Sequence, residues 1–368
     1  MIRTISSDLK AFGPHTQPSA PLAALAVLTC ALASACLTVP RAPAVSGLPP
    51  DDYAAPFSAV WVGHATVLMR FGRTTVMADP NLGNNILLMP RSVPASLKPS
   101  EVPPVDVVLL SHLHMDHFDA PTLHALGPRP TVILPGNGAS YLDEIDQPDK
   151  RVLPDWQTVE VAGLRITAVP ARHTGGRYGF DFIYNHAYCG YVIEGAGHRV
   201  WFAGDTGYDP VMFKEIGRRF PGLEVAFIPI APSRKDTLGA KDGWGHVGPN
   251  LALQIFEDVG ARAMVPIHFE AFYASGSSLD VPRKLLMDAA RKRGDLERVI
   301  AWHPGESILL DDDGVRSMDA ALVSDVRAGK RHVRDAKVAV SFAAPGNSSL
   351  ASSAHSGAAP ARQRALAQ

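Results

Sequence analysis

The sequence has few cysteines and almost no net charge. Its three cysteines, Cys30, Cys36 and Cys189, are too few for a disulfide framework or for a cysteine-rich zinc module. Lysine and arginine together number 35 against 36 aspartates and glutamates, giving a formal net charge of −1. We therefore expect no nucleic acid as the main partner. Because 46% of the residues are hydrophobic and 19% are charged, the composition is that of a globular protein and excludes disorder throughout.

A long hydrophobic run is also missing. The apolar stretch Pro21–Cys36 is shorter than the ~20 residues that a membrane-spanning helix needs. It ends in Ala33-Ser34-Ala35-Cys36, an A-x-A cleavage pattern that also resembles a bacterial lipoprotein site, with Ala33 where leucine is usual. We expect residues 1–36 to be an export signal that leads to the periplasm or outer membrane. Cys36 is then a candidate for a lipid tether.

The rest of the chain divides by composition into a linker, a body and a tail. Residues 37–56 are rich in proline and alanine, as linkers are, and the chain after residue 344 is mostly alanine, serine and glycine. We expect a poorly ordered tail over 326–368. The body, 57–325, has the length of one large domain, since single folds run to about 250 residues.

Short β-branched runs alternate with helical patterns in the body. Strands that read as continuous Val, Leu and Ile runs are buried on both faces, which requires helices on each side of a sheet and predicts the α/β class. The expected strands are Ala59–Val62, Thr66–Phe71, Thr74–Ala78, Val107–Leu110, Thr131–Leu134, Leu164–Val169, Gly190–Glu194, Val200–Phe202, Val225–Ile228, Ala263–Pro266 and Val299–Trp302. The expected helices are Pro121–Leu126, Pro210–Phe220, Pro249–Val259 and Val281–Arg293.

Histidine is abundant, and its spacing points to metal binding. The segment Ser111-His112-Leu113-His114-Met115-Asp116-His117 follows an apolar strand and carries three histidines and an aspartate, which are ligands for zinc and similar ions. Three further candidates, His173, Asp205 and His268, each follow a predicted strand. A lone histidine after a strand is weak evidence, but four ligands delivered to one sheet edge would form a shared two-metal site.

Together these motifs resemble the metallo-β-lactamase fold. The stretches Trp61–Thr66, Asp79-Pro80, Trp201–Tyr208 and Gly245–Pro249 are similar, more narrowly, to N-acylphosphatidylethanolamine-hydrolysing phospholipase D and its bacterial relatives. The similarity runs from about Val60 to about Glu306. It implies an α/β fold of the αββα sandwich type, with two mixed sheets face to face and helices outside.

The resemblance also implies a binuclear centre. His112, His114 and His173 would hold the first ion, Asp116, His117 and His268 the second, and Asp205 would bridge them. Zinc is the first choice, with iron or manganese as alternatives. Asp116 and the site-facing His246 are the candidate catalytic residues. The chain departs from the family pattern at Pro249-Asn250, where a Pro-Glu pair is usual, so no role is carried over for that carboxylate.

The leading hypothesis is a metal-dependent phosphodiesterase of the phospholipase D type, acting on a lipid-like or other small-molecule substrate. A lactonase or carboxylic-ester hydrolase of the same fold is the alternative, and a metal-binding envelope protein without turnover is a more distant one. β-Lactam hydrolysis is less expected, since that branch lacks the WVGHAT and GHVGP stretches. A homodimer is an expectation from the relatives alone.

The remaining candidates have supporting roles. We expect His64 and Asp79 to orient ligands and Asp119 to cap a helix. Arg172 and Tyr208 are candidate substrate contacts. We expect Cys189 to be a thiol packed in the interior. Residues Ile86–Met89, in the loop Leu82–Lys98, would form either an exposed apolar lip or a patch packed on the sheet, and we favour packing. The histidines without a motif, expected to be bystanders, are His15, His124, His186, His198, His303, His332 and His355.

Overall fold

The computed structural model describes residues 55–179, 181, 185–232, 245–272, 279–332 and 335–342. The expected export signal, most of the expected linker and the last part of the expected tail lie outside these residues. Within them, no helix is both long and apolar enough to cross a membrane.

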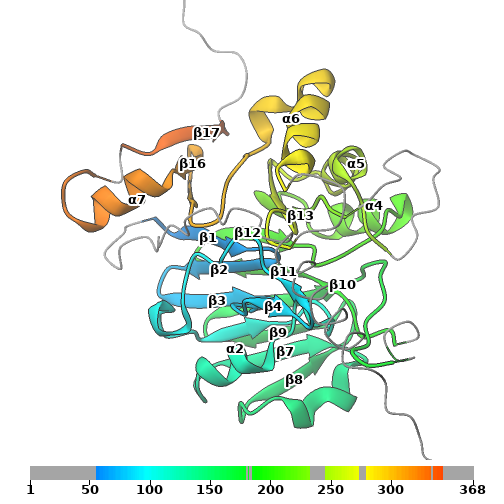
Figure 1. Ribbon diagram of the computed structural model, residues 1–368. Helices are drawn as coiled ribbons and strands as arrows, with labels where there is room; N and C mark the ends of the chain where they lie inside the picture. Colours follow the sequence, from blue (N-terminus) through cyan, green and yellow to red (C-terminus); the bar gives the residue numbers. More distant parts are fainter. Residues whose placement is uncertain are drawn as a thin grey trace, which may run out of the picture. The chain divides into compact units, whose positions relative to one another are not determined.

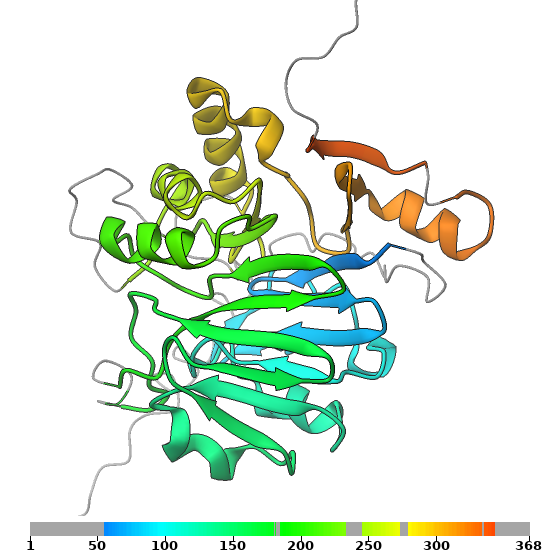
Figure 2. The same ribbon diagram turned by 180° about the vertical axis from the view of Figure 1, so that it is seen from behind.

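Two mixed sheets make up most of the described structure (Figures 1 and 2). In the described residues the larger sheet has nine strands in the order β17-β16-β15-β1-β2-β3-β6-β7-β8, and the smaller has six in the order β14-β13-β12-β11-β10-β9. The larger sheet comprises β1 Phe57–Gly63, β2 Thr66–Phe71, β3 Thr74–Ala78, β6 Val107–Leu109, β7 Thr131–Pro135, β8 Lys150–Leu153, β15 Ser307–Asp311, β16 Gly314–Met318 and β17 Lys337–Ser341. The smaller comprises β9 Thr158–Val161, β10 Leu164–Val169, β11 Gly190–Gly195, β12 His198–Phe202, β13 Val225–Pro229 and β14 Ala263–Ile267.

The core lies between the sheets, because alternate side chains of each strand point inward. On β3, Val76 and Ala78 belong to this inner core, whereas Met77 between them belongs to a second cluster on the other face. That second cluster includes Leu123 of the helix α2, Ala120–Ala125. The larger sheet is therefore buried on both faces, as its apolar strands predicted.

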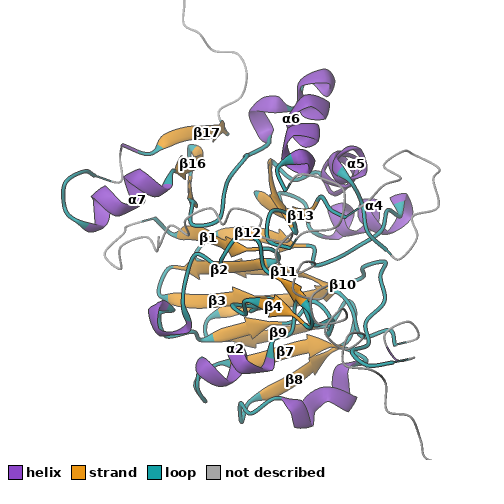
Figure 3. Ribbon diagram, in the orientation of Figure 1, coloured by secondary structure: helices purple, strands orange, loops and turns teal. Residues whose placement is uncertain are grey.

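The helices lie outside the sheets (Figure 3), which confirms the predicted αββα sandwich. Asp119 caps α2 by accepting a hydrogen bond from the backbone N–H of Thr122, as predicted. The other helices are α4 Pro210–Arg219, α5 Pro249–Val259, α6 Val281–Arg293 and α7 Ala320–Arg327, with short 3₁₀ turns η1 Pro99–Glu101, η2 Gly138–Glu144 and η3 Leu296–Arg298. Gly260 and Gly294 end α5 and α6 in the left-handed conformation that glycine adopts without strain.

Two sequence predictions about the C-terminal part are wrong. Val299–Trp302 is not a strand, since among the described residues its pairing is a single bridge between Val299 and Met264, and the Trp302 indole N–H donates to the Pro266 carbonyl. The ordered body also does not end at residue 325: α7 continues to Arg327, and β17 pairs with β16. A small cluster that includes Leu309, Met318 and Val323 holds this extension on the sheet.

The prediction that Ile86–Met89 packs on the sheet is also wrong. These residues form a hairpin of β4, Asn85–Ile86, and β5, Met89–Pro90. Leu87, Leu88 and Met89 are 70%, 99% and 41% exposed.

Candidate metal centre

Strand ends from both sheets deliver the candidate ligands to one edge. β3 and β6 run parallel, and β12, β13 and β14 run parallel in the other sheet. The segments after β6, β10, β12 and β14 carry the predicted ligands, consistent with the rule that open α/β sheets present their sites at carboxyl ends. His64 joins them from the turn between β1 and β2.

His112, His114 and His173 form the first set. His112 Nε2 lies 3.0 Å from His114 Nδ1, and His173 Nε2 lies 3.3 Å from the same atom. All three are buried. Three imidazole nitrogens converging from β6 and β10 are a suitable set of ligands for one ion.

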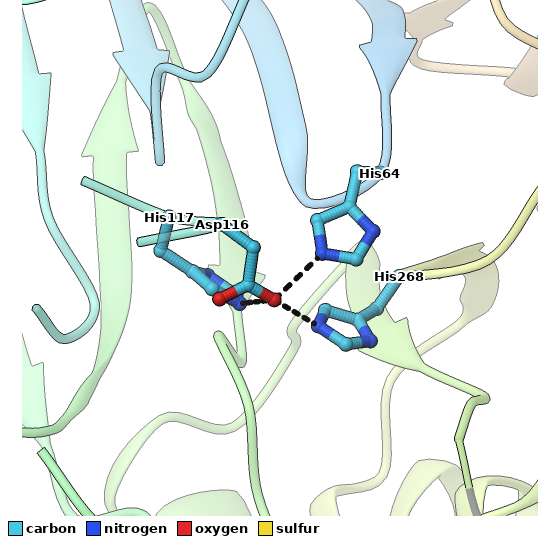
Figure 4. Close-up of side chains that lie close together, drawn as sticks. All are labelled: His64, Asp116, His117 and His268. Carbon is cyan, nitrogen blue, oxygen red and sulfur yellow. Dashed lines mark hydrogen bonds and ion pairs between the residues drawn. The ribbon is translucent and has the colours of Figure 1, made fainter. Parts of the chain in front are cut away.

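His64, Asp116, His117 and His268 form the second set (Figure 4). Asp116 Oδ2 lies 2.9 Å from His64 Nε2, 3.5 Å from His117 Nε2 and 3.4 Å from His268 Nε2. His64, predicted to orient ligands, thus bonds directly to Asp116 and is also close enough to act as a ligand.

Asp205 lies between the two sets. Its Oδ2 is 3.2 Å from His117 Nε2, 3.0 Å from His268 Nε2 and 3.8 Å from His173 Nε2. Both carboxylate oxygens are buried and make no hydrogen bond. His117 Nε2 and His268 Nε2 likewise have no hydrogen-bond partner despite these short approaches. Buried polar atoms left unpaired are costly, so this cluster fits a site for cations that pair with all of them.

The outward nitrogens of three histidines are held by acceptors. His117 Nδ1 lies 2.7 Å from Asp79 Oδ2, and His173 Nδ1 lies 2.9 Å from the Gly245 carbonyl. His268 Nδ1 lies 2.7 Å from the Ala231 carbonyl. An N–H donated outward aims the other ring nitrogen, Nε2, at the cluster, which is the arrangement found around metal-ligating histidines. The predicted orienting role of Asp79 agrees with this geometry.

Charges inside the site shift the pKa values of the second set. Burial works against a charge on His117 and His268, but Asp205 and Asp116 outweigh it: the pKa of His117 rises well above its usual range and that of His268 rises to about 9. Burial likewise works against ionised Asp116 and Asp205, but the surrounding histidines hold both pKa values well below the usual range. Both carboxylates are therefore ionised at neutral pH.

The first set behaves differently. Burial, followed by neighbouring histidines, lowers the pKa of His112 well below its usual value. Burial also lowers the pKa of His173 to about 3, although Asp205 opposes the shift. These two imidazoles are neutral at neutral pH, which is the form that binds metal. Burial and the nearby His268 lower the pKa of His64 to about 3, so its contact with Asp116 is a hydrogen bond from a neutral ring.

His246 lies beside both sets of ligands. Its Nδ1 is 3.5 Å from Asp205 Oδ2, and its ring contacts those of His173 and His268. Its side chain is partly exposed, and burial lowers its pKa. The structure thus brings His246 to the site.

The two substrate-contact candidates, Arg172 and Tyr208, make contacts within the scaffold. The Tyr208 hydroxyl donates to Asp258 of α5 at 2.7 Å, and its ring stacks on Phe213. Arg172 donates from Nη1 to the Tyr208 carbonyl. Cys189 is a buried free thiol, as predicted.

Most of the bystander histidines have local partners. His124, His198 and His303 contact Asp146, Glu224 and Glu270, and His186 contacts Tyr188. His332 is exposed, and His15 and His355 lie outside the described residues.

Two supporting residues escaped the sequence analysis. The Ser111 hydroxyl donates to Asp79 Oδ2 at 2.6 Å, and its position directly before His112 was an available signal. The segment His112–His117 is called the metal loop below. Arg177 donates to the carbonyls of Leu113, inside this loop, and Phe118, just after it, and stacks over the Phe118 ring. Nothing in the sequence around Arg177 indicated this role.

The fold and the facing His/Asp sets define the metallo-β-lactamase class. The family model of the beta-lactamase superfamily domain matches residues 74–269, more than half of the 368-residue chain. The chain therefore belongs to this family.

Relatives agree with this placement. An uncharacterized protein of Mycobacterium tuberculosis is 29% identical over 244 residues, covering 62% of this chain and 63% of the relative. The mitochondrial N-acyl-phosphatidylethanolamine-hydrolyzing phospholipase D of Saccharomyces cerevisiae is 26% identical over 274 residues, covering 70% of this chain and 56% of that enzyme. The chain thus matches less than two thirds of the length of these two relatives. The resemblance predicted from the motifs is confirmed.

A solved structure supports the fold. Igni18, a metallo hydrolase from the archaeon Ignicoccus hospitalis, superposes with a TM-score of 0.52 at 20% identity, covering 69% of this chain and 98% of that one.

Proposed function

We propose that the protein is a metal-dependent hydrolase and, within that class, a phosphodiesterase of the phospholipase D type acting on a lipid-like substrate. The observation that carries the proposal is the convergence of buried imidazole and carboxylate atoms that have no hydrogen-bond partner. The fold hosts several reactions, so the choice among them rests on the site and on the likeness to the yeast enzyme.

Two divalent ions, zinc as first choice, fit the two sets of ligands. His112, His114 and His173 would hold one, Asp116, His117 and His268 the other, and Asp205 would serve both. Ions bound there would lower the pKa of a water molecule towards neutrality and offset the negative charge that develops on phosphoryl oxygens.

The residues of the chain itself position the reactants. The Asp116 carboxylate is ionised and partly exposed, and the hydrogen bond from His64 fixes its orientation. It can therefore accept a hydrogen bond from an attacking water molecule. This bond orients the water so that a lone pair of its oxygen points at phosphorus. His246 is neutral at neutral pH, and its side chain is also partly exposed. It can donate its N–H to a phosphoryl or leaving-group oxygen.

The test is hydrolysis of bis(p-nitrophenyl) phosphate by the full chain, before and after treatment with a chelator and after zinc is restored. We expect turnover that the chelator removes and zinc recovers. N-acylphosphatidylethanolamine is the next substrate to assay. Absence of phosphodiester turnover in protein with metal bound would overturn the phosphodiesterase proposal, and turnover of a lactone or carboxylic ester would then replace it.

The variant Asp205→Asn tests the shared role of Asp205. Because this side chain approaches histidines of both sets, we expect it to lose metal at both and to lose activity by more than a hundredfold. Asp209→Asn is the matched control, since Asp209 only caps α4 and asparagine caps helices equally well. Full activity in Asp205→Asn would contradict the two-metal proposal.

We also propose that the protein is exported, with Cys36 as a candidate lipid tether. The apolar stretch and the Ala33-Ser34-Ala35-Cys36 pattern support this. Cell fractionation of wild type and Cys36→Ala tests it. Recovery of the wild-type protein in the cytoplasm would contradict export.

A further inference from the structure

The hairpin formed by β4 and β5 carries an apolar tip. Leu87, Leu88 and Met89 are consecutive and exposed. The other large exposed apolar side chains among the described residues are Tyr178, Val211, Leu285 and Val338, which stand singly on separate elements. Scattered apolar side chains are normal on a protein surface, but a contiguous group marks an interaction site.

The backbone at the tip makes the choice of leucine unusual. Leu87 and Leu88 are the two residues that link β4 to β5, and Leu87 has a φ of +51°. Two-residue hairpin turns favour Asn-Gly or Asp-Gly, because a positive φ is strained for a side chain such as leucine. Exposed leucines at these positions serve neither the turn nor the core. Strained residues of this kind concentrate where the chain has a function to perform.

The tip is also free of charge. No acidic or basic residue occurs between Asp79 and Arg91, and the exposed polar residues at the base of the hairpin are the amides Asn84 and Asn85. A surface that binds a charged partner would carry complementary charges, which this segment lacks. An uncharged apolar tip with a polar base matches the gradient from acyl chains to headgroups at a lipid surface.

The base of the hairpin is fixed to the metal centre. Arg91 is buried and donates from Nη2 to the Asn81 carbonyl at 2.7 Å, while the Asn81 amide donates to the Met115 carbonyl at 3.0 Å, next to Asp116. The Arg91 guanidinium also lies over the ring of Phe272, and Phe272 packs edge-on against His64, with 4.9 Å between ring centroids. The tip therefore projects from the rim of the second set of ligands.

We infer that this hairpin inserts into the lipid–water interface and brings the metal centre to the headgroups. Three side chains are too few for a stable protein–protein interface, which needs about 800 Å² from each partner. A lipid layer, in contrast, gains from each apolar side chain that enters it. The catalytic consequence rests on the proposed function, but the insertion itself does not.

A tryptophan at the tip tests insertion directly. Leu88→Trp is placed in the full chain and mixed with phosphatidylcholine vesicles whose acyl chains carry bromine, a quencher confined to the bilayer interior. The chain has five tryptophans of its own, so the signal is the difference from wild type. We expect quenching of the added tryptophan in Leu88→Trp and none in the control Leu285→Trp, on α6. No quenching at position 88 would overturn the inference.

A double variant tests the consequence for activity. Leu87→Asn with Leu88→Gly installs the residues that the turn prefers, so the fold is kept while the apolar tip is removed. We expect activity on vesicle-borne N-acylphosphatidylethanolamine to fall at least tenfold while hydrolysis of bis(p-nitrophenyl) phosphate is unchanged. Leu285→Gln should change neither. Equal loss on both substrates would contradict an interfacial role for the tip.

The two experiments separate the two proposals. Quenching at position 88 with no hydrolysis of any phosphodiester would leave the insertion standing and remove the phosphodiesterase. Hydrolysis of phosphodiesters without quenching would do the reverse.

Discussion

His117 Nδ1 lies 2.7 Å from Asp79 Oδ2, and neither side chain has any exposed surface. The Asp79 carboxylate also accepts hydrogen bonds from the backbone N–H and the hydroxyl of Ser111. One carboxylate, fixed by the residue that precedes the metal loop, therefore sets the orientation of a ring inside that loop.

Asp79→Asn should weaken metal binding at the second set, although Asp79 is not one of the ligands in that set. If the new amide oxygen keeps the bond from the Ser111 backbone, its NH₂ faces His117 Nδ1 and donates to it. The ring proton then moves to Nε2, the atom that would bind metal. We expect metal affinity at the second set to fall about 10–100-fold, measured by competition with a chromogenic chelator.

Asp119→Asn is the control for this variant. Asp119 lies just after His117 and caps α2, and asparagine is an equally good cap. Equal metal affinities in Asp79→Asn and wild type would show that the orienting bond has no energetic role.

The pH dependence of stability should reveal the protons that a metal displaces. The pKa of His268 in the folded, chelator-treated protein is raised from 6.5 to about 9. The stability that protonated His268 adds to the folded state is therefore fully present below pH 6.5 and is lost as the pH rises through about 9. His117, whose pKa is also raised, adds in the same direction. We expect chelator-treated protein to lose stability across this range more steeply than zinc-loaded protein.

Urea unfolding at a series of pH values measures this difference. The pKa of His303, raised mainly by its hydrogen bond to Glu270, affects both forms equally and cancels in the comparison. Parallel curves for the two forms would contradict proton displacement at the second set.

Arg177→Lys should loosen the metal loop. Lysine keeps the charge but lacks the planar guanidinium, which stacks over the Phe118 ring while its Nη1 donates to the carbonyls of Leu113 and Phe118. The side chain is largely buried, so we expect a loss of about 1–3 kcal/mol in the free energy of unfolding. Urea denaturation measures it. Arg151→Lys, at an exposed pair with Asp149, should change stability by less than about 0.5 kcal/mol, and equal effects of the two variants would contradict the role of Arg177.

Gly204→Ala should disturb the loop that carries Asp205. Gly204 has a φ of +61°, and a Cβ there would collide with the Ser111 side chain. Gly260, with a φ of +68° and no atom within 4 Å of such a Cβ, isolates the cost of the backbone conformation. We expect Gly260→Ala to cost about 1 kcal/mol and Gly204→Ala distinctly more, with weaker metal binding as well. Thermal unfolding compares them, and equal losses would exclude the collision.

The residues that converge on the centre were predictable because each follows an apolar strand. His173 and His268 are weak evidence individually. They point to a metal site only because the strands before them end at the same edge, which brings together residues far apart in the chain. The backbone acceptors at Ala231 and Gly245 carry no sequence signal, since every residue has a carbonyl. Their positions depend on how the loops pack.

Two other features depend on tertiary context. The strands β16 and β17 bury few apolar side chains and read as irregular sequence until β15 offers them an edge to pair with. The apolar segment Ile86–Met89 has the composition of a packed patch, and nothing local shows that Arg91 is buried and holds the segment at the rim. Composition alone could not decide between these environments.

The spread of the ligands along the chain has a consequence for assembly. A chain that emerges from the ribosome presents His64 and the metal loop early, but His268 follows β14, about two hundred residues after His64. The second set is complete only after β14, the last strand of the smaller sheet, has docked. Because metal binding is coupled to folding in such sites, metal at the second set reports that β14 has joined the smaller sheet, before α6 and the last strands of the larger sheet need to have formed.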